Sequence, residues 1–309
     1  MGRYVVRRLL QMIPVFIGVT LLVFLAMYAL PGDPVRALFG EGQFDPAFVE
    51  RKRDELGLND PIWQQYLNYL WNLLHGNFGE QIARGTPVSE VIGDALPNTL
   101  RLTLLAVLIT IAVGIPLGLI AGLKAGRWLD SLILVVALLF VSVPIFVFGF
   151  LAKWLFGYQL KIVEPVVQDA ENWGQLIMPA AVLAALSLAY VIRLTRTSVA
   201  ENMRSDYIRT AVAKGLPRRR IMSMHLLRNS LIPVVTFIGV DIGALLSGAV
   251  ITEGIFNING IGSELFEALF RREGSTVVGI TTLIVIIYLI ASLVVDLLYA
   301  VLDPRIRYE

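Results

Sequence analysis

The sequence predicts an all-α polytopic membrane protein with six transmembrane helices. Hydrophobic residues make up 56% of the 309 residues and charged residues only 16%, whereas soluble domains carry about 25% charged residues. Several uncharged apolar runs approach the ~20 residues that a helix needs to cross a bilayer. Arginines gather in the short stretches between these runs, as the positive-inside rule leads us to expect on the cytosolic side.

The first predicted span is the uncharged run at residues 9–30. Arg3, Arg7 and Arg8 precede it, so it runs from the cytosol to the outside. A signal peptide also begins with basic residues, but its apolar region is only ~7–15 residues long. We therefore interpret this run as a membrane span.

Residues 31–98 form the one sizeable polar segment, which is predicted to be extracytoplasmic. The sequence PGDP at 31–34 indicates a turn. Residues 46–57 favour a short charged helix, and residues 61–76 an aromatic amphipathic one. In the second, one face is shared by Ile62, Tyr66, Tyr69 or Leu70, and Leu73. Its tryptophans, Trp63 and Trp71, suit the headgroup level of a membrane. Packing on a small domain of its own is an equal alternative.

The other predicted spans cover residues 102–123, 132–156, 176–192, 231–251 and 277–301. The first of these carries Gly114, Gly118 and Gly122, a spacing that lets helices approach closely. The helix of residues 176–192 is expected to continue into the cytosol through Val199. Six spans place both termini in the cytoplasm. The predicted divisions are residues 1–30, 31–98 and a membrane core at 99–309, with a polar loop at 199–230.

That polar loop predicts a cytosolic elbow of two short helices at residues 206–233. Its arginines would each cost several kcal/mol in hydrocarbon, so the loop belongs in water. Asp206 is a candidate N-cap, Gly215 fits the left-handed position that closes a helix, and Pro217 fits the first turn of the next. The second helix would present an apolar stripe to a partner, formed by Ile221, Met224 and Leu227.

Several functional classes are disfavoured by what the sequence lacks. There are no cysteines, which excludes disulfides, thiolate metal sites and cysteine nucleophiles. No P-loop, G-x-S-x-G or H-E-x-x-H motif is present, so an ATP-driven role requires a separate ATPase. Only Asp241 lies deep in a predicted span, which is thin support for an ion-coupled secondary transporter. DNA binding by the elbow is disfavoured by its tether between spans, whereas contact of Arg218–Arg220 with anionic lipid remains open.

The elbow sequence DYIRTAVAKGLPRRRI, followed by HLLRNSLIPVVT, resembles the EAA loop of ABC-importer inner-membrane subunits. The resemblance is to the bacterial dipeptide/oligopeptide/nickel permease family, in its B-type form, and it covers nearly the whole chain. Further matching stretches are YVVRRLLQMIPVFIGVTLLVF, PGDP, LGLNDPIWQQYLNYL, LPNTLRLTLLA, GIPLGLIAGLKAG, TEGIFNINGIG and VVDLLYAVLDPRIR. Two departures stand out. Arg209 replaces the usual Glu of the loop, and Asn259-Gly260-Ile261-Gly262 replaces the usual Pro-Gly-Leu-Gly.

This resemblance implies a permease subunit in a bacterial inner membrane that carries dipeptides or oligopeptides inward. Nickel, glutathione and haem are alternative cargoes of the same machinery. The implied partners are a second homologous permease, two cytosolic ATPase subunits holding ATP and Mg, and an extracytoplasmic solute-binding protein docking on residues 31–98. No catalytic residue, metal site, cofactor or nucleic-acid partner is implied for this chain itself.

Two sets of site residues follow. The ATPase-coupling set is Ala213, Lys214, Gly215, Leu216, Pro217, Arg218, Ile221, Met224 and His225. The substrate-path candidates are Asp241 and, more weakly, Ser142, Ser187 and Ser247. A hydrogen bond within the loop is an alternative role for His225, and a structural hydrogen bond to a neighbouring helix or subunit is an alternative role for Asp241.

Overall fold

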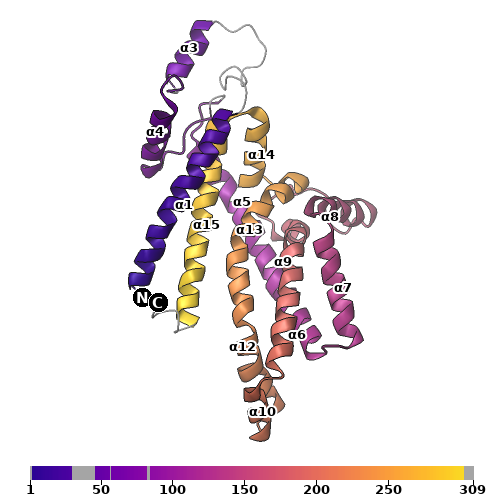
Figure 1. Cartoon of the computed structure of the whole chain (residues 1–309). Helices are drawn as coiled ribbons and strands as arrows, with labels where there is room; N and C mark the ends of the chain where they lie inside the picture. Colours follow the sequence, from indigo (N-terminus) through magenta and orange to yellow (C-terminus); the bar gives the residue numbers. More distant parts are fainter. Residues whose placement is uncertain (1, 30–45, 56, 82–83, 303–309) are drawn as a thin grey trace. The chain divides into compact units, whose positions relative to one another are not determined.

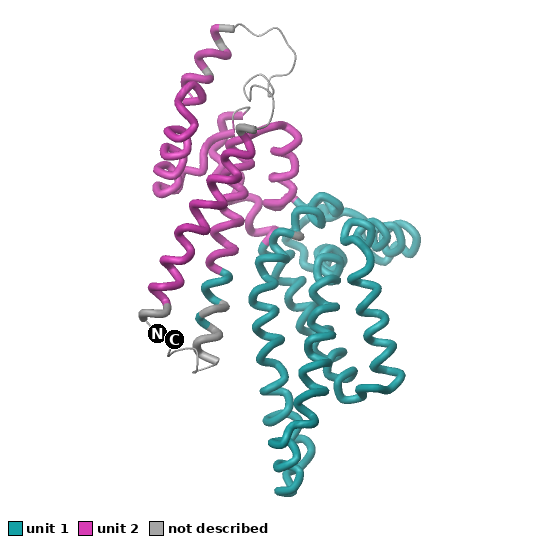
Figure 2. The backbone as a smooth tube through the Cα atoms, in the orientation of Figure 1, with its two compact units in different colours: residues 1, 100–258, 291–309 teal, residues 2–99, 259–290 magenta. Residues whose placement is uncertain are grey.

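The computed structural model describes residues 2–29, 46–55, 57–81 and 84–302 (Figure 1). Over this part of the chain the fold is helical, apart from one isolated β-bridge between Glu80 and Pro87, which confirms the predicted all-α class. The turn predicted at 31–34 lies outside the described residues. The backbone forms two compact units (Figure 2): residues 1, 100–258 and 291–309 make one, and residues 2–99 and 259–290 make the other.

The unit of residues 2–99 and 259–290 contains both helices predicted in the polar segment. Its elements are α1 (Gly2–Ala29), α3 (Pro46–Glu55), α4 (Ile62–Leu74), the start of α5 (Val88–Ile109), α14 (Ile261–Arg271) and most of α15 (Gly274–Leu302). Tyr66 is buried on the predicted face of α4 and packs with Phe24 of α1 and Val278 of α15. The predicted aromatic amphipathic helix is therefore confirmed, and it lies against membrane helices.

The unit of residues 100–258 and 291–309 is built around α9 (Trp173–Asn202), which α6, α7, α8 and α13 contact. Most of the side chains of α9 in its central part are buried. The surrounding elements are the π-helix Thr110–Gly114, α6 (Ile115–Leu123), α7 (Trp128–Ser142), α8 (Ile145–Ala152), the π-helix Lys153–Gln159 and α13 (Ile232–Phe256). Between α9 and α13 lie α10 (Asp206–Ala213), α11 (Arg218–Arg220), the π-helix Ile221–Leu227 and α12 (Arg228–Ser230).

A ladder of glycines lets α6 approach α9 closely. A Cβ at Gly118 would lie 2.5 Å from the Cβ of Thr195, and one at Gly122 would lie 2.7 Å from that of Val199. Real Cβ atoms do not come this near, so side chains at these two positions would force the helices apart. The close approach predicted from the glycine spacing is confirmed.

Membrane spans account for most of the helical structure. The helices long and apolar enough to cross a bilayer are Val5–Met27, Val88–Leu123, Trp173–Asn202 and Gly274–Val294. Two further pairs qualify only as bent spans: Trp128–Ser142 with Ile145–Gln159, and Arg218–Ser230 with Ile232–Ser247. The described chain thus holds four spans, or up to six when each bent pair counts as one. The six spans predicted from the sequence correspond to the upper of these two counts.

The predicted span at residues 132–156 corresponds to a bent helix pair, because the helix breaks at Pro144. Its two halves meet at 104°. Pro144 itself has ψ 140°, and Val143 before it is extended at φ −102°, ψ 125°. A proline disfavours helical dihedrals in the residue before it, which explains the break. Apolar composition alone carried no sign of it.

The second span also begins earlier than predicted, at Val88 rather than residue 102. Val88, Ile92 and Ala95 fall at helical spacing and are buried against Ile261 and Ile280. Hydropathy missed these turns because polar residues lie between the buried positions.

Candidate functional site: a hinged elbow and a polar seam between α9 and α13

The elbow between α9 and α13 bends at a helix terminus closed by Gly215. Gly215 has φ +71°, its N–H donates to the Val212 carbonyl (2.9 Å), and the Leu216 N–H donates to the Ala211 carbonyl (3.2 Å). These two bonds make the Schellman motif, and Leu216 packs against the apolar cluster that contains Ala211. The predicted left-handed position of Gly215 is confirmed.

The two other predicted boundaries of the elbow are each wrong by one residue. Ser205, with φ −70° and ψ 152°, is the N-cap of α10, and Asp206 is its first helical residue. Pro217, with ψ 140°, precedes α11 instead of lying in its first turn. Both shifts preserve the predicted arrangement of two helices joined by a glycine corner.

The predicted stripe of Ile221, Met224 and Leu227 is wrong, because residues 221–227 form a π-helix. A π-helix turns more slowly than an α-helix, so residues five apart share a face. Ile221 and Leu226 accordingly point inward and are buried, whereas Met224 is 58% exposed. The inner face of the second helix is thus Ile221 with Leu226, and Met224 is left on the surface.

An apolar cluster under the corner joins the elbow to the membrane helices. Its buried members are Val199 of α9, Ile208, Ala211, Ile221 and Leu226, and Leu119, Leu216 and Met222 pack against them. Because Val199 lies in α9 and Leu119 in α6, the two elbow helices are fixed to the ends of those helices. The elbow is therefore a packed extension of the membrane core rather than a free loop.

Asn202 is the centre of a polar network at the base of the elbow. Its Nδ2 donates to the Ser198 carbonyl (2.9 Å) and to Ser230 Oγ (3.2 Å), and its Oδ1 accepts from the Tyr207 hydroxyl. Ser230 is fully buried and also donates to the Ser198 carbonyl. These bonds connect α9, α10 and α12, so they set the angle at which the elbow leaves α9.

Most of the predicted coupling residues lie on the surface of the elbow. Exposed are Ala213, Lys214, Gly215, Pro217, Arg218 and Met224. Leu216 and His225 are half-buried, and Ile221 is buried. Val212, which the sequence did not single out, is 60% exposed on the same elbow. The exposed surface of the elbow therefore includes the apolar side chains of Val212 and Met224 and the basic residues at its corner.

A half-buried ion pair joins α7 to α9 near the elbow. Asp130, only 3% exposed, accepts from Arg196 Nε at 3.0 Å and from its Nη2 at 2.7 Å. The Gly126 N–H donates to Asp130 Oδ2 (2.8 Å). Two parallel bonds and a backbone donor satisfy this carboxylate, the geometry in which a buried charge is tolerated.

The substrate-path candidates separate into two groups. The side chain of Asp241 in α13 lies close to Ser187, which is buried in the middle of α9. One helical turn further along the same contact, the Tyr190 and Phe237 rings lie 5.8 Å apart. We call these four residues the polar seam. Ser142 and Ser247 instead donate to carbonyls of their own helices, Leu138 and Gly243, and neither reaches the seam residues through a described bond.

The polar seam places a carboxyl group at mid-span with no described ion pair. On insertion scales such an aspartate costs roughly 2.5–3.5 kcal/mol at a helix centre. One hydroxyl offsets only part of this. The arrangement therefore suits a water-filled passage, a cationic cargo group or a cation on another subunit. In the described part of the chain, no cluster of three or more His, Asp and Glu side chains is placed to hold a metal ion.

Sequence reasoning missed the Asn202 network and the Asp130–Arg196 pair. Asp130 and Arg196 are 66 positions apart, so no local pattern joins them. A usable signal existed, since a carboxylate beside one apolar run and an arginine at the end of another are each costly alone and favourable together.

Comparisons with known proteins agree with this architecture. The sequence profile of the family described as "Binding-protein-dependent transport system inner membrane component" matches residues 114–308, which include the elbow and the seam. A second profile, for the N-terminal part of such membrane components, matches residues 1–103.

Curated relatives match along their whole length. The dipeptide transport system permease protein DppB of Escherichia coli K12 is 38% identical, with all of both chains covered. The di/tripeptide transport system permease protein DppB of Pseudomonas aeruginosa is 37% identical, with 99% of each covered. A putative peptide transport system permease protein of Brucella abortus is 38% identical over the full length of both.

Proposed function

Because this chain belongs to the family of binding-protein-dependent transport system inner membrane components, we propose that it is the permease subunit through which peptides enter the cell. It is a multi-pass inner-membrane transport component and is not itself catalytic. The peptide assignment is supported by full-length similarity to permeases named for dipeptides, di/tripeptides and peptides.

The elbow is the proposed attachment point for a cytosolic ATPase. Its exposed residues include the apolar Val212 and Met224 and the basic Lys214 and Arg218–Arg220. We propose that two ATPase subunits carry ATP and Mg, one of them holding this elbow. Both termini are then cytoplasmic, since arginines at the elbow and the N-terminus favour the same side. A second permease and an extracytoplasmic binding protein complete the proposed assembly.

The apolar cluster and the Asn202 network support a mechanical role for the elbow. A segment fixed to α9 by apolar and polar contacts, and to α6 by the apolar cluster, transmits displacement instead of absorbing it. ATP binding by the partner subunits would bias a pore with two arrangements by moving the elbow. The predicted coupling residues keep this role as a proposal, with Val212 added to them.

Uptake by the reconstituted complex tests the proposed function. We expect proteoliposomes containing this chain, its second permease, both ATPase subunits and the binding protein to accumulate a labelled dipeptide only with ATP and Mg. Omitting the ATPase subunits should abolish accumulation. Equal uptake without them would contradict an ATP-driven permease, and ATP-dependent uptake of Ni²⁺ but not of dipeptide would contradict the peptide assignment.

For the seam, we predict that Asp241→Asn slows the uptake of cationic dipeptides about tenfold at saturating binding protein, because hydrogen bonds to charged groups contribute ~1.5–3 kcal/mol. Uptake of N-acetylated neutral dipeptides should change much less. Ser247→Ala is the matched control, since Ser247 lies two turns away on α13 and bonds its own helix. Equal slowing of both peptide classes would instead indicate a structural role for Asp241.

A further inference from the structure

The amphipathic helix α4 has an apolar face wider than the protein covers. Its thirteen residues, IWQQYLNYLWNLL, include nine apolar or aromatic side chains, four amides and no charge. At about 100° per residue the amides Gln64, Gln65, Asn68 and Asn72 share one arc. The nine other residues fill the remaining arc, which is more than half of the helix circumference.

Hydrogen bonds to two membrane helices fix the depth of α4. The Tyr66 hydroxyl donates to the Ile17 carbonyl (3.0 Å) and lies 2.9 Å from Thr20 Oγ1, both inside the span Val5–Met27. Thr20 is seven residues from the end of that span, which corresponds to ~10 Å at 1.5 Å per residue. The Tyr69 hydroxyl donates to Thr282 of α15 (2.6 Å), inside the span Gly274–Val294. One side of α4 therefore lies at hydrocarbon depth.

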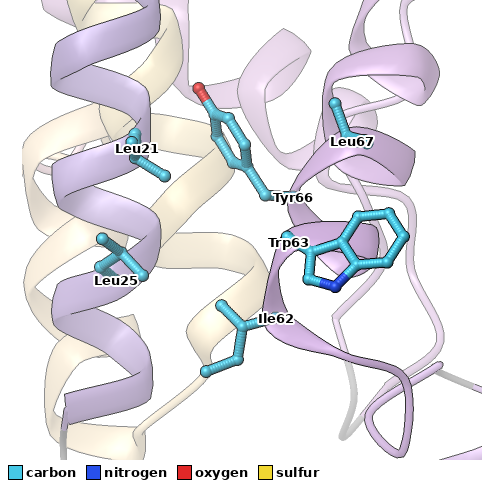
Figure 3. Close-up of a pocket in the computed structure, with 6 residues that line it drawn as sticks. All are labelled: Leu21, Leu25, Ile62, Trp63, Tyr66 and Leu67. Atoms are coloured by element: carbon cyan, nitrogen blue, oxygen red, sulfur yellow. The ribbon is translucent and has the colours of Figure 1, made fainter.

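The other part of the apolar arc is largely exposed in the described part of the chain. Trp63, Leu67, Trp71 and Leu74 follow one another at spacings of four, four and three, and all are exposed. Between this stripe and α1 lies a hollow of about 460 Å³ (Figure 3). It is lined by Leu21, Leu25, Ile62, Trp63, Tyr66 and Leu67.

The chemistry of the hollow selects its occupant. A peptide or loop needs partners for its backbone N–H and C=O groups. The lining side chains carry only two polar groups: the Tyr66 hydroxyl, which is already bonded to α1, and the indole N–H of Trp63, a single donor. The α1 side of the hollow belongs to a span of which only 11% is buried in the described structure. The hollow is thus continuous with a surface that hydrocarbon covers.

We propose that α4 lies in the membrane leaflet at the C-terminal end of α1, and that a phospholipid acyl chain fills the hollow between α1 and α4. The amide arc then faces the headgroups and water, and the tryptophans lie at the interface that they favour. This inference does not depend on the transported cargo.

Single cysteines test the proposal, because the natural chain has none. Nitroxide labels at Leu67→Cys and at its neighbour Asn68→Cys, in the complete complex in phospholipid vesicles, report on the two arcs. We expect the label at 67 to collide severalfold more often with oxygen, which partitions into hydrocarbon, than with a water-soluble nickel chelate. The label at 68 should show the opposite preference. Leu74→Cys and Asn72→Cys repeat the comparison one to two turns further along.

A second measurement addresses the hollow itself. In a variant whose other four tryptophans are replaced by phenylalanine, the fluorescence of Trp63 should be quenched more strongly by phospholipids brominated on their acyl chains than by acrylamide. If the label at position 67 collides more often with the nickel chelate than with oxygen, or if acrylamide quenches Trp63 more strongly, water covers this face and the proposal is overturned. Protection of 67 from both oxygen and nickel would overturn it in favour of a protein partner.

Discussion

Replacing Asp130 by alanine is expected to destabilise the protein by about 1–3 kcal/mol, because Arg196, whose side chain is 28% exposed, would keep its charge and lose its partner. Asp130 is 3% exposed and receives both guanidinium bonds as well as the Gly126 N–H. Thermal unfolding in detergent, followed by size-exclusion chromatography, measures the loss. Since the pair lies beside the α6–α9 contact, the folded fraction should fall before transport is tested.

Two further variants separate the charge from the packing. The double variant Asp130→Leu with Arg196→Leu removes both charges and should recover much of the stability. Asp206→Ala breaks the exposed Arg209–Asp206 pair (3.5 Å, side chains 73% and 95% exposed) and should change the midpoint little. If the single Asp130→Ala variant is as stable as the wild type, the ion pair does not contribute to the stability of the fold.

Replacing Gly215 by valine is expected to reduce ATP-driven transport at least about tenfold, because a residue with a Cβ pays ~1–2 kcal/mol in the left-handed conformation and a β-branched one more. The backbone relieves this strain by opening the Schellman motif, which moves Arg218–Arg220 and Met224 away from their present positions. Uptake into proteoliposomes measures the effect, and membrane insertion should be unchanged.

Gly85→Val is the matched control for this variant. Gly85 also has positive φ (+66°), is exposed, and has no atom within 4 Å of an added Cβ, as at Gly215. It therefore receives the same local strain outside the elbow. Loss of transport in Gly215→Val alone supports the hinge, whereas equal losses in both variants would not assign the effect to the elbow, because Gly85 lies in the segment expected to meet the binding protein. Normal transport by Gly215→Val would contradict the coupling role of the elbow.

The features that the sequence predicted are those fixed by local backbone chemistry. Gly215 closes a helix because only glycine adopts its dihedrals without strain, and Gly118 marks a close helix contact because any side chain would collide there. Pro144 had a comparable local signal, since proline restricts the residue before it. Hydropathy averaged over a window concealed that signal.

The features that escaped prediction depend on long-range geometry. The π-helix at Ile221–Leu227 replaces the expected period of 3.6, and the buried position therefore moved from Met224 to Leu226. The contact of Ser187 with Asp241 depends on how α9 and α13 are rotated against each other. Asp241 was nevertheless a candidate from the sequence, because an ionisable residue deep in a span is rare.

The glycine ladder between α6 and α9 lets these two helices pack closely enough that we expect them to move together. A side chain at Gly118 or Gly122 would clash with α9, so this close contact depends on glycine at both positions. The thirty residues of α9 amount to ~45 Å at 1.5 Å per residue, more than the hydrocarbon thickness. A tilt of α9 applied at one membrane surface would therefore also displace its end at the opposite surface, and the lipids and neighbouring helices there would have to move.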